Sequence, residues 1–480
     1  MEFIIKYLKN DDVDGFEQSK HALTSLDPNE MSKLPNIFYS NPNFIAYVAF
    51  YGAMNCFLSL QKQGESVDDV DDENRSAIHF ACAGGNCKMV NMLIEDLDQF
   101  HNVDSLGRSP LHYAIEYNQN CITKFLVEKY TSDLSDCLDA SLLINKKDIF
   151  GMTPFHLSVE NENEEIVDYL IENGANVNLS DADGCVPVHI AAKIGSFQLL
   201  SKLIQKGAKA NKKSKNGRTL FHFAAFSGSP WIINKIISTF KEEGDVKINI
   251  NTPDQFGRIP LHYACEQGSV SVVEELLKLH SDVNLRDVDG MLPIHFAAIK
   301  GNTDIIQLLI KYRSPVYAKD SNLRTPLHLA CECGSYKAVR LLCRKFKNLV
   351  NEETKNGLTP LHSLASSDFD VDNADLVHYL VSKGSDINKK TKFGQTPLQC
   401  AIENGFLNTI GALVESGADL NIMNSSNSKG NEVYYSPKIS ASSSSLSSAF
   451  QSPCSSPNIS RRSPTKSTFI SQDMNLDELL

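Results

Sequence analysis

Histidine recurs along this chain with a spacing close to 33 residues, and this period constrains the fold more than any other feature. Nine of the 13 histidines fall in the same short motif. They are His79, His112, His156, His189, His222, His262, His295, His328 and His362. Successive members lie 33, 44, 33, 33, 40, 33, 33 and 34 residues apart. A period of this length indicates a solenoid, in which each unit buries its apolar face against its neighbours.

The residues around each histidine repeat as well. Full copies of the motif are Ser109-Pro110-Leu111-His112-Tyr113-Ala114, Ile259-Pro260-Leu261-His262-Tyr263-Ala264 and Thr325-Pro326-Leu327-His328-Leu329-Ala330. A 33-residue period with Thr-Pro-Leu-His-x-Ala is the signature of ankyrin repeats. Over residues 41 to about 424 the chain therefore resembles the ankyrin-repeat family. The resemblance implies an all-α solenoid whose units each have two antiparallel helices and a β-hairpin finger.

Elementary helix chemistry agrees with the resemblance. Threonine at the front of the motif is a favourable N-cap, and proline follows at the first helical position, where its missing N–H costs nothing. Paired small residues such as Ala297 and Ala298 let a neighbouring helix approach closely, and a glycine such as Gly301 ends the helix. A second apolar-periodic segment then predicts a second helix, and an Asp/Asn/Gly cluster predicts a turn.

We divide the chain into an N-terminal helical cap at 1–40, an ankyrin repeat array at 41–424 and a disordered tail at 425–480. The array has about eleven units, counting a degenerate first unit at 41–75 and a last unit in which Gln399 replaces the histidine. A divergent repeat is the alternative for residues 1–40. Inserts around 132–143 and 241–250 account for the two long histidine intervals. Eighteen of the 56 tail residues are serine, and this composition predicts disorder.

Charge and composition argue against several classes of protein. The net charge of −12 is unfavourable for direct nucleic-acid binding, which needs a basic face. The apolar runs are shorter than the roughly 18 residues of a membrane span, so we expect no membrane insertion. The N-terminus lacks the pattern of a signal peptide. Twelve cysteines without an export signal predict reduced thiols and a location in the cytoplasm, with the nucleus as a second compartment.

The repeated histidines are poor candidates for metal or acid–base chemistry, because their period keeps them too far apart to meet at one ion. The resemblance implies that each histidine bonds to the turn and fixes the stacking between units. His328, Cys331, Cys333 and Cys343 form the densest set of possible zinc ligands. Their spacing matches no common zinc pattern, and a cysteine at position 331 acts as a small buried residue. We expect no metal and no cofactor.

The chain contains no nucleotide-binding, serine-hydrolase or metalloprotease motif. The repeats account for almost every residue that is expected to fold, so we expect no enzyme activity. We expect a scaffold or adaptor that binds one or more partner proteins on the concave face of the solenoid. The alternatives are a regulatory inhibitor whose tail controls access to that face and a non-catalytic substrate-receptor subunit of a larger enzyme.

Apolar residues at positions that the family exposes on its concave face are candidate anchors for a partner. They are Tyr117, Phe150, Phe226, Phe256 and Ile299. Trp231, the single tryptophan, is a further candidate that is either exposed or packed beneath the 241–250 insert. The competing interpretation is that these side chains only fill space between neighbouring repeats.

Two of the predicted fingers are basic, and the tail contains sites that could be phosphorylated. The basic residues are Lys206, Lys209, Lys212, Lys213, Lys215 and Arg218 in one finger and Lys389, Lys390 and Lys392 in another. The Ser-Pro pairs of the tail resemble sites of proline-directed kinases, at Ser436, Ser452, Ser456 and Ser463. A tail-directed kinase is therefore an expected partner. We expect a phosphorylated tail to fold back on the finger of Lys389 and to compete there with a partner.

Overall fold

The computed structural model describes residues 2–25, 34–40, 42–95, 99–133, 141–242, 249–367 and 374–420. The chain divides into two units, Met1–Ser436 and Pro437–Leu480. All of the described residues belong to the first unit, and the tail predicted from residue 425 onward lies outside them.

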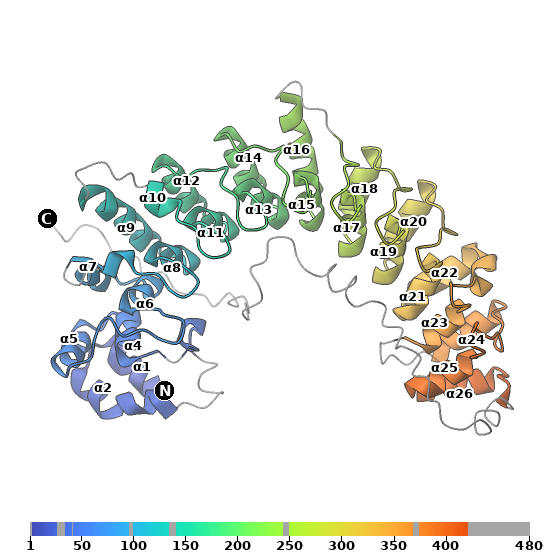
Figure 1. Ribbon diagram of the computed structural model, residues 1–480, viewed down its shortest axis with the longest axis horizontal. Helices are drawn as coiled ribbons and strands as arrows, with labels where there is room; N and C mark the ends of the chain where they lie inside the picture. The colour runs from blue at the N-terminus through green and yellow to red at the C-terminus, as the bar shows by residue number, and fades with distance from the viewer. Residues whose placement is uncertain are drawn as a thin grey trace. The chain divides into compact units, whose positions relative to one another are not determined.

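Paired helices follow one another through the first unit, so that one row is made of first helices and another of second helices (Figure 1). The first helices are α4 (Phe44–Tyr51), α6 (Ala77–Gly84), α8 (Pro110–Glu116), α11 (Pro154–Glu160), α13 (Pro187–Ile194), α15 (Leu220–Phe226), α17 (Pro260–Gln267), α19 (Pro293–Lys300), α21 (Pro326–Glu332), α23 (Pro360–Ala365) and α25 (Pro397–Asn404). The second helices are α5 (Met54–Lys62), α7 (Cys87–Glu95), α9 (Asn120–Asp133), α12 (Glu164–Glu172), α14 (Phe197–Gln205), α16 (Pro230–Glu242), α18 (Val270–Lys278), α20 (Thr303–Lys311), α22 (Tyr336–Lys345), α24 (Ala374–Ser382) and α26 (Leu407–Glu415). Each first helix packs against the first helices of the adjacent repeats and against its own second helix. The predicted all-α repeat architecture is confirmed.

Seven of the nine motif histidines join their helix start to the next finger, whereas Nε2 of His79 and of His156 has no hydrogen-bond partner among the described residues. In α21, Nδ1 of His328 accepts a hydrogen bond from the backbone N–H of Thr325 at 3.1 Å. Because a backbone N–H can only donate, Nδ1 is unprotonated and Nε2 carries the proton. Nε2 donates to the carbonyl of Leu358 in the next finger at 3.1 Å. Gln399 keeps the first of these two bonds, since its side-chain oxygen accepts from the N–H of Thr396 at 2.9 Å.

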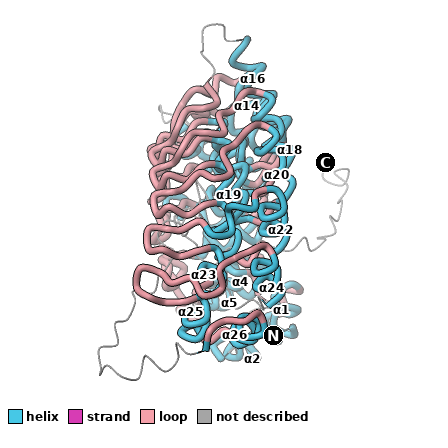
Figure 2. The backbone as a smooth tube through the Cα atoms, turned by 90° about the vertical axis from the view of Figure 1, so that its right-hand side faces the viewer, coloured by secondary structure: helices cyan, strands magenta, loops and turns pink. Residues whose placement is uncertain are grey.

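The fingers are turns that hydrogen-bond to one another along the stack. At each tip a backbone N–H donates to a carbonyl of the preceding tip, as Lys215 does to Asp183 at 2.8 Å and Val288 does to Phe256 at 2.9 Å. Such bonds link successive tips from Ser40 onward. The turns lie along one side of the stack and the second helices along the other (Figure 2). No strand occurs among the described residues, so the expected β-hairpins are not formed there. Successive tips share a single backbone hydrogen bond rather than the ladder of bonds that defines a strand.

A further helix pair precedes the array. α1 (Glu2–Lys9) packs against α2 (Val13–Ser19) and α4, and α2 packs against α5. First-to-first and second-to-second contacts of this kind also join neighbouring repeats. The two predicted inserts follow α9 and α16, and their residues 134–140 and 243–248 lie outside the described ranges. A short helix, α10 (Ser141–Ile144), follows the first of them.

Candidate functional site

Three of the candidate anchors lie on three consecutive repeats, and we call them the central surface. Phe226 ends α15, Phe256 lies at the finger tip before α17, and Ile299 lies in the last turn of α19. All three are half-buried. The ring of Phe226 lies 5.0 Å from that of Tyr263, and the Arg218 guanidinium carbon lies 6.0 Å from the Phe256 ring. Arg218 and Tyr263 thus connect the two phenylalanines, and Ile299 follows on the next first helix.

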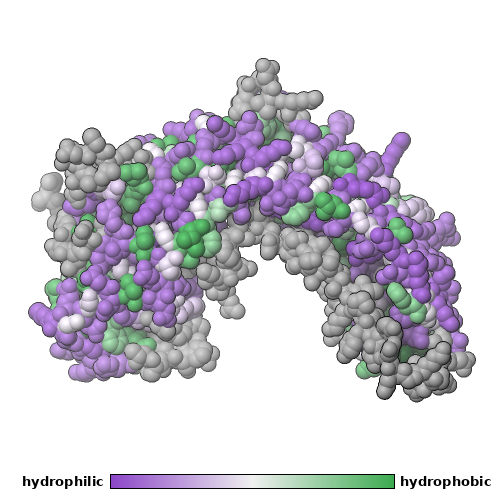
Figure 3. Space-filling view, in the orientation of Figure 1, coloured by the Kyte–Doolittle hydropathy of each residue, from purple (hydrophilic) through white to green (hydrophobic). Residues whose placement is uncertain are grey.

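The remaining candidate anchors are not part of this cluster. Tyr117, directly after α8, is half-buried and stacks on Tyr113 with 6.5 Å between the rings. Burial raises the pKa of the Tyr117 phenol. Phe150 is half-buried at another finger tip. Trp231 lies on α16, in the row of second helices. It is 71% exposed, so of the two alternatives for this side chain the exposed one is observed. Hydrophobic residues are scattered over a mainly hydrophilic surface (Figure 3).

A buried ion-pair network underlies the central surface. Nε of Arg218 lies 3.4 Å from Oδ2 of Asp254, and a terminal nitrogen of Arg218 donates to the Tyr263 hydroxyl at 3.0 Å. Tyr263 in turn donates to Asp254 at 2.6 Å. Nε of Arg258 lies 3.2 Å from Oδ2 of Asp287 in the following finger. Because buried charges are tolerated only when they are paired, the network holds the fingers and first helices of these repeats in a defined arrangement.

Glu266 is a charged residue of this region that the sequence analysis missed. It lies on α17 four residues after His262, the position that Phe226 occupies on α15 and Ile299 on α19. Its Oε2 atom is buried and has no hydrogen-bond partner. Burial raises the pKa of the Glu266 carboxyl to about 7. Glutamate recurs at this position of the motif, so its presence alone does not distinguish Glu266 from the glutamates of other repeats.

The basic finger before α15 is smaller than predicted. The exposed lysines are Lys206, Lys209, Lys213 and Lys215. Lys212 is half-buried, and its Nζ donates to the carbonyl of Asn178 at 3.0 Å. Arg218 is 6% exposed and forms an ion pair with Asp254. Its assignment to a surface patch is therefore wrong, because the residue that follows the finger turn points back into the stack.

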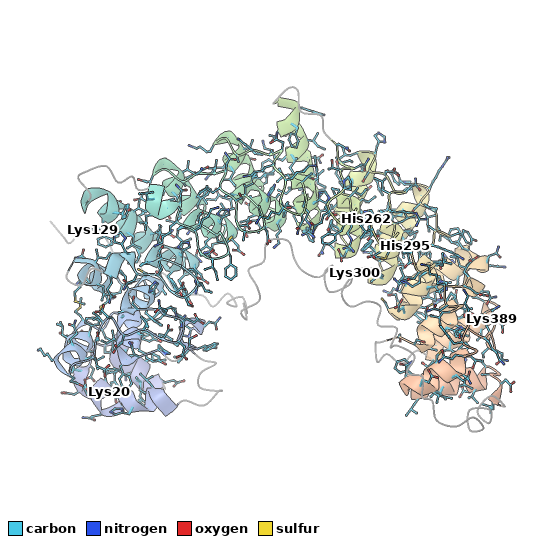
Figure 4. All side chains as sticks on the ribbon, in the orientation of Figure 1. Lys20, Lys129, His262, His295, Lys300 and Lys389 are labelled. Carbon is cyan, nitrogen blue, oxygen red and sulfur yellow. The ribbon has the colours of Figure 1, made fainter. Side chains whose placement is uncertain are left out.

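The C-terminal basic finger has two exposed lysines, Lys390 and Lys392. Lys389 forms an ion pair with Glu353 of the preceding repeat at 2.8 Å. Phe393, which the sequence analysis did not select, is 72% exposed at the tip of the same finger. Figure 4 labels Lys389 in this part of the array. The predicted phosphorylation sites at 436, 452, 456 and 463 lie outside the described residues.

The motif histidines are buried and neutral. Burial lowers the pKa of His112 and His262 to about 3. It lowers the pKa of the other seven to about 4. Within the described ranges, no three His, Cys, Asp or Glu side chains form a group that could hold a metal ion. Nor is any described helix long and apolar enough to cross a membrane.

The described cysteines are mostly buried and free. The free ones are Cys56, Cys82, Cys87, Cys121, Cys265, Cys331, Cys333, Cys343 and Cys400. Burial raises the pKa of Cys333 and of Cys343 to about 12, which makes both poor thiolate donors for a metal. Cys185 is disulfide-bonded, so the prediction of reduced thiols is wrong for that residue.

Comparison with known proteins gives partial similarities to very different molecules. The chain is 32% identical over 128 residues to human transient receptor potential cation channel subfamily A member 1, and 25% identical over 186 residues to L-asparaginase from Dirofilaria immitis. These matches cover 26% and 34% of this chain, but the chain spans only 11% and 31% of the two relatives. The crystal structure of the human ASB11 ankyrin repeat domain is 25% identical, with a TM-score of 0.43. That match covers 49% of this chain and 99% of the other.

The match to a whole family is much more extensive. Ankyrin repeats, in sets of three copies, match residues 45–136, 133–214, 188–287, 271–352 and 345–424. These ranges run through the helix pairs from α4 to α26. They include every motif histidine and the central surface. The chain belongs to the ankyrin-repeat family.

Proposed function

We propose that this chain is a non-catalytic adaptor or scaffold that binds a partner protein through the central surface. Ankyrin repeats generally mediate protein–protein interactions, and the fold is typically a non-catalytic binding module. The observation that carries the proposal is the cluster of Phe226, Phe256 and Ile299 over a buried ion-pair network.

The energetics of protein recognition support this choice of surface. Hot spots of interfaces are large side chains held in well-packed surroundings, so that little conformational freedom is lost on binding. Phe226 and Phe256 are half-buried and held by Tyr263 and Arg218, yet each keeps part of its ring accessible. Trp231 is larger and more exposed, but within the described ranges no aromatic ring packs against it. We therefore place the main anchor at the central surface and treat Trp231 as a secondary contact.

The test compares a variant that removes the apolar side chains of the central surface with a control variant on the row of second helices. Changing Phe226, Phe256 and Ile299 together to serine should weaken binding of a purified partner by about 2 kcal/mol or more. Changing Phe197, which is 49% exposed on α14, to serine should leave the affinity unchanged. The partner is taken from proteins that co-purify with the full chain, and affinities are then measured by calorimetry. Equal binding by the triple variant and the unaltered chain, with both folded by circular dichroism, would reject the central surface.

A second candidate function is regulation by the tail, which is favoured by the C-terminal finger. Lys390 and Lys392 are exposed beside Phe393, a combination suited to an acidic or phosphorylated segment with an apolar residue. We propose that the phosphorylated tail competes with a partner at this finger. Synthetic peptides covering 430–470, phosphorylated and plain, should differ in their affinity for residues 1–424, and the difference should vanish when Lys390 and Lys392 are changed to glutamine. Equal binding of both peptides would remove the regulatory role.

A further inference from the structure

Two repeats, those of α8 and α21, each use a self-contained set of three charged residues. In the repeat of α8, Arg108 bonds Asp104 of its own finger at 2.8 Å and Glu116 at 3.0 Å. In the repeat of α21, Arg324 bonds Asp320 at 2.8 Å and Glu332 at 3.3 Å. The glutamate in each case lies eight residues after the arginine and four residues after the motif histidine. It is neutralised inside its own repeat.

The middle repeats contain the same residue types, but the pairs are shifted by one repeat. The finger of Arg218 has Ser214 where most other fingers have aspartate, so Arg218 reaches Asp254 of the following finger. Because Asp254 already forms an ion pair with Arg218, Arg258 pairs with Asp287 of the following finger instead. The shift ends there, because the finger of Asp287 has Met291 where an arginine would stand.

The shift leaves one carboxylate without its usual partner. Glu266 lies eight residues after Arg258, as Glu116 does after Arg108, but the Arg258 side chain is engaged by Asp287. Glu266 accordingly forms no ion pair with a described residue, and its Oε2 is buried with no hydrogen bond. Phe226 and Ile299 occupy the same position on the two adjacent first helices. A single unpaired carboxylate therefore lies between two apolar side chains.

We infer that Glu266 binds a cationic side chain of the partner protein, a lysine or an arginine, whose aliphatic stem packs between Phe226 and Ile299. This inference rests on the proposed function and specifies the chemistry of the partner. A long cationic residue matches both halves of the site, since its stem is apolar and its head is charged. Glu266 is half-buried, and its buried Oε2 atom has no hydrogen-bond partner. Leaving a buried polar atom unpaired is costly, so an interaction that pairs this carboxylate is favourable.

The surroundings of Glu266 favour a cation from outside over one from within the chain. Its charged neighbours are Arg218 and Arg258, Asp287 of the following finger, and Lys300 on α19. Both arginines are held by aspartates. Lys300, which Figure 4 shows on α19 together with His295, is exposed. The histidines of the packed first helices, His222, His262 and His295, are buried and neutral near pH 7.

The probe is a set of histidine-free peptides selected from a random displayed library against the full chain at pH 8. The selected peptides should share a lysine or arginine flanked by apolar residues. Changing Glu266→Gln should weaken the binding of these peptides at least tenfold. Changing the peptide cation to glutamine should weaken binding equally, and the two changes together should weaken it no further than either one alone. Glu116→Gln and Glu332→Gln are matched controls at equivalent positions, and both should leave peptide binding unchanged because these carboxylates are already paired.

A pH series gives a second readout that a merely structural role would not produce. Since burial raises the pKa of the Glu266 carboxyl to about 7, and a cation binds the ionised form, affinity should rise roughly tenfold from pH 6 to pH 8. The Glu266→Gln variant should show no such rise.

The variants separate this inference from the proposed function. If the peptides bind the triple serine variant of the central surface with unchanged affinity, the proposed function fails at this site. If the triple variant loses binding while Glu266→Gln retains it, or if the peptides share no cation, the inference alone is overturned.

Discussion

The repeat of Arg324 and the repeats between Ser214 and Met291 are built from the same kinds of charged residue, yet they present different surfaces. In the first, arginine, aspartate and glutamate close on one another. In the second, each arginine pairs one repeat ahead, and Glu266 is left between Phe226 and Ile299. A missing aspartate at one finger therefore changes the chemistry of a surface on the following repeat.

The Arg324 pair and the two shifted pairs also differ in burial. The side chain of Arg324 is 21% exposed, whereas those of Arg218 and Arg258 are each 7% exposed. Water screens charges less well in the shifted repeats, so their ion pairs are more strongly coupled and harder to break. The shifted repeats are thus rigid beneath a surface that retains one unsatisfied group.

The largest expected effect is on stability when Arg258 is changed to alanine. Asp287, whose side chain is fully buried, would lose its cation, and removing one partner of a buried pair costs roughly 3–5 kcal/mol. Arg324→Ala should cost less, because that pair is closer to solvent. Lys278→Ala, in an exposed pair with Glu274, should cost about 0–1 kcal/mol. Urea denaturation of the three variants measures their free energies of unfolding. Equal losses for the Arg258 and Arg324 variants would show that the two ion pairs do not differ in strength.

An intermediate effect is expected when Glu266 is changed to glutamine in the absence of any partner. The folded pKa of about 7 lies above the unfolded value of about 4.3. The stability contributed by the protonated carboxyl is present in full below about pH 4.3 and is lost as pH rises through 7. The glutamine variant should therefore gain about 1–2 kcal/mol relative to the unaltered chain between pH 5.5 and pH 8.

The control for this measurement is Glu116→Gln, which breaks the pair with Arg108. It should lower stability slightly at both pH values. Thermal unfolding curves at pH 5.5 and 8 supply the data, and a loss of stability in Glu266→Gln at pH 8 would show that the carboxylate is paired after all.

A smaller effect should follow from restoring the missing aspartate with Ser214→Asp. Ser214 already accepts a hydrogen bond from the Arg218 backbone at 3.2 Å, as the aspartates of other fingers do, so the change fits the turn. Arg218 should return to its own finger, and Arg258 should then bridge Asp254 and Glu266. The pH-dependent gain described for Glu266→Gln should shrink by about 1 kcal/mol when it is measured in this background. An unchanged gain would show that Ser214 does not set the register of the pairs.

Much of the fold was predictable from the sequence, because each copy of the motif contains the residues that form its own helix and its contacts with the next repeat. The helix starts, the role of the histidines and the capping by Gln399 all depend on contacts within a repeat or with the next finger. Local chemistry of that kind is visible in a motif. The finger tips were expected to be hairpins, but the single bond between successive tips forms no strand.

The site was less predictable, since it depends on which of two possible partners a long side chain reaches. Arg218 was assigned to a surface patch on the basis of its lysine neighbours, whereas its turn directs it inward to Asp254. Glu266 was overlooked because glutamate recurs at its position in several repeats, so nothing in the motif itself distinguishes it. Ser214 and Met291 carried the signal, but reading it requires knowing that successive fingers are adjacent in space.

Site-specific photocrosslinking is the most direct test of whether a partner binds at the central surface. A photoreactive phenylalanine analogue is placed at Phe226 in one sample and at Phe197 on the row of second helices in another, and each is irradiated with a peptide selected against the full chain. We expect a covalent adduct at position 226 that excess unlabelled peptide suppresses, and no adduct at position 197. An adduct at position 197 with none at position 226 would contradict it.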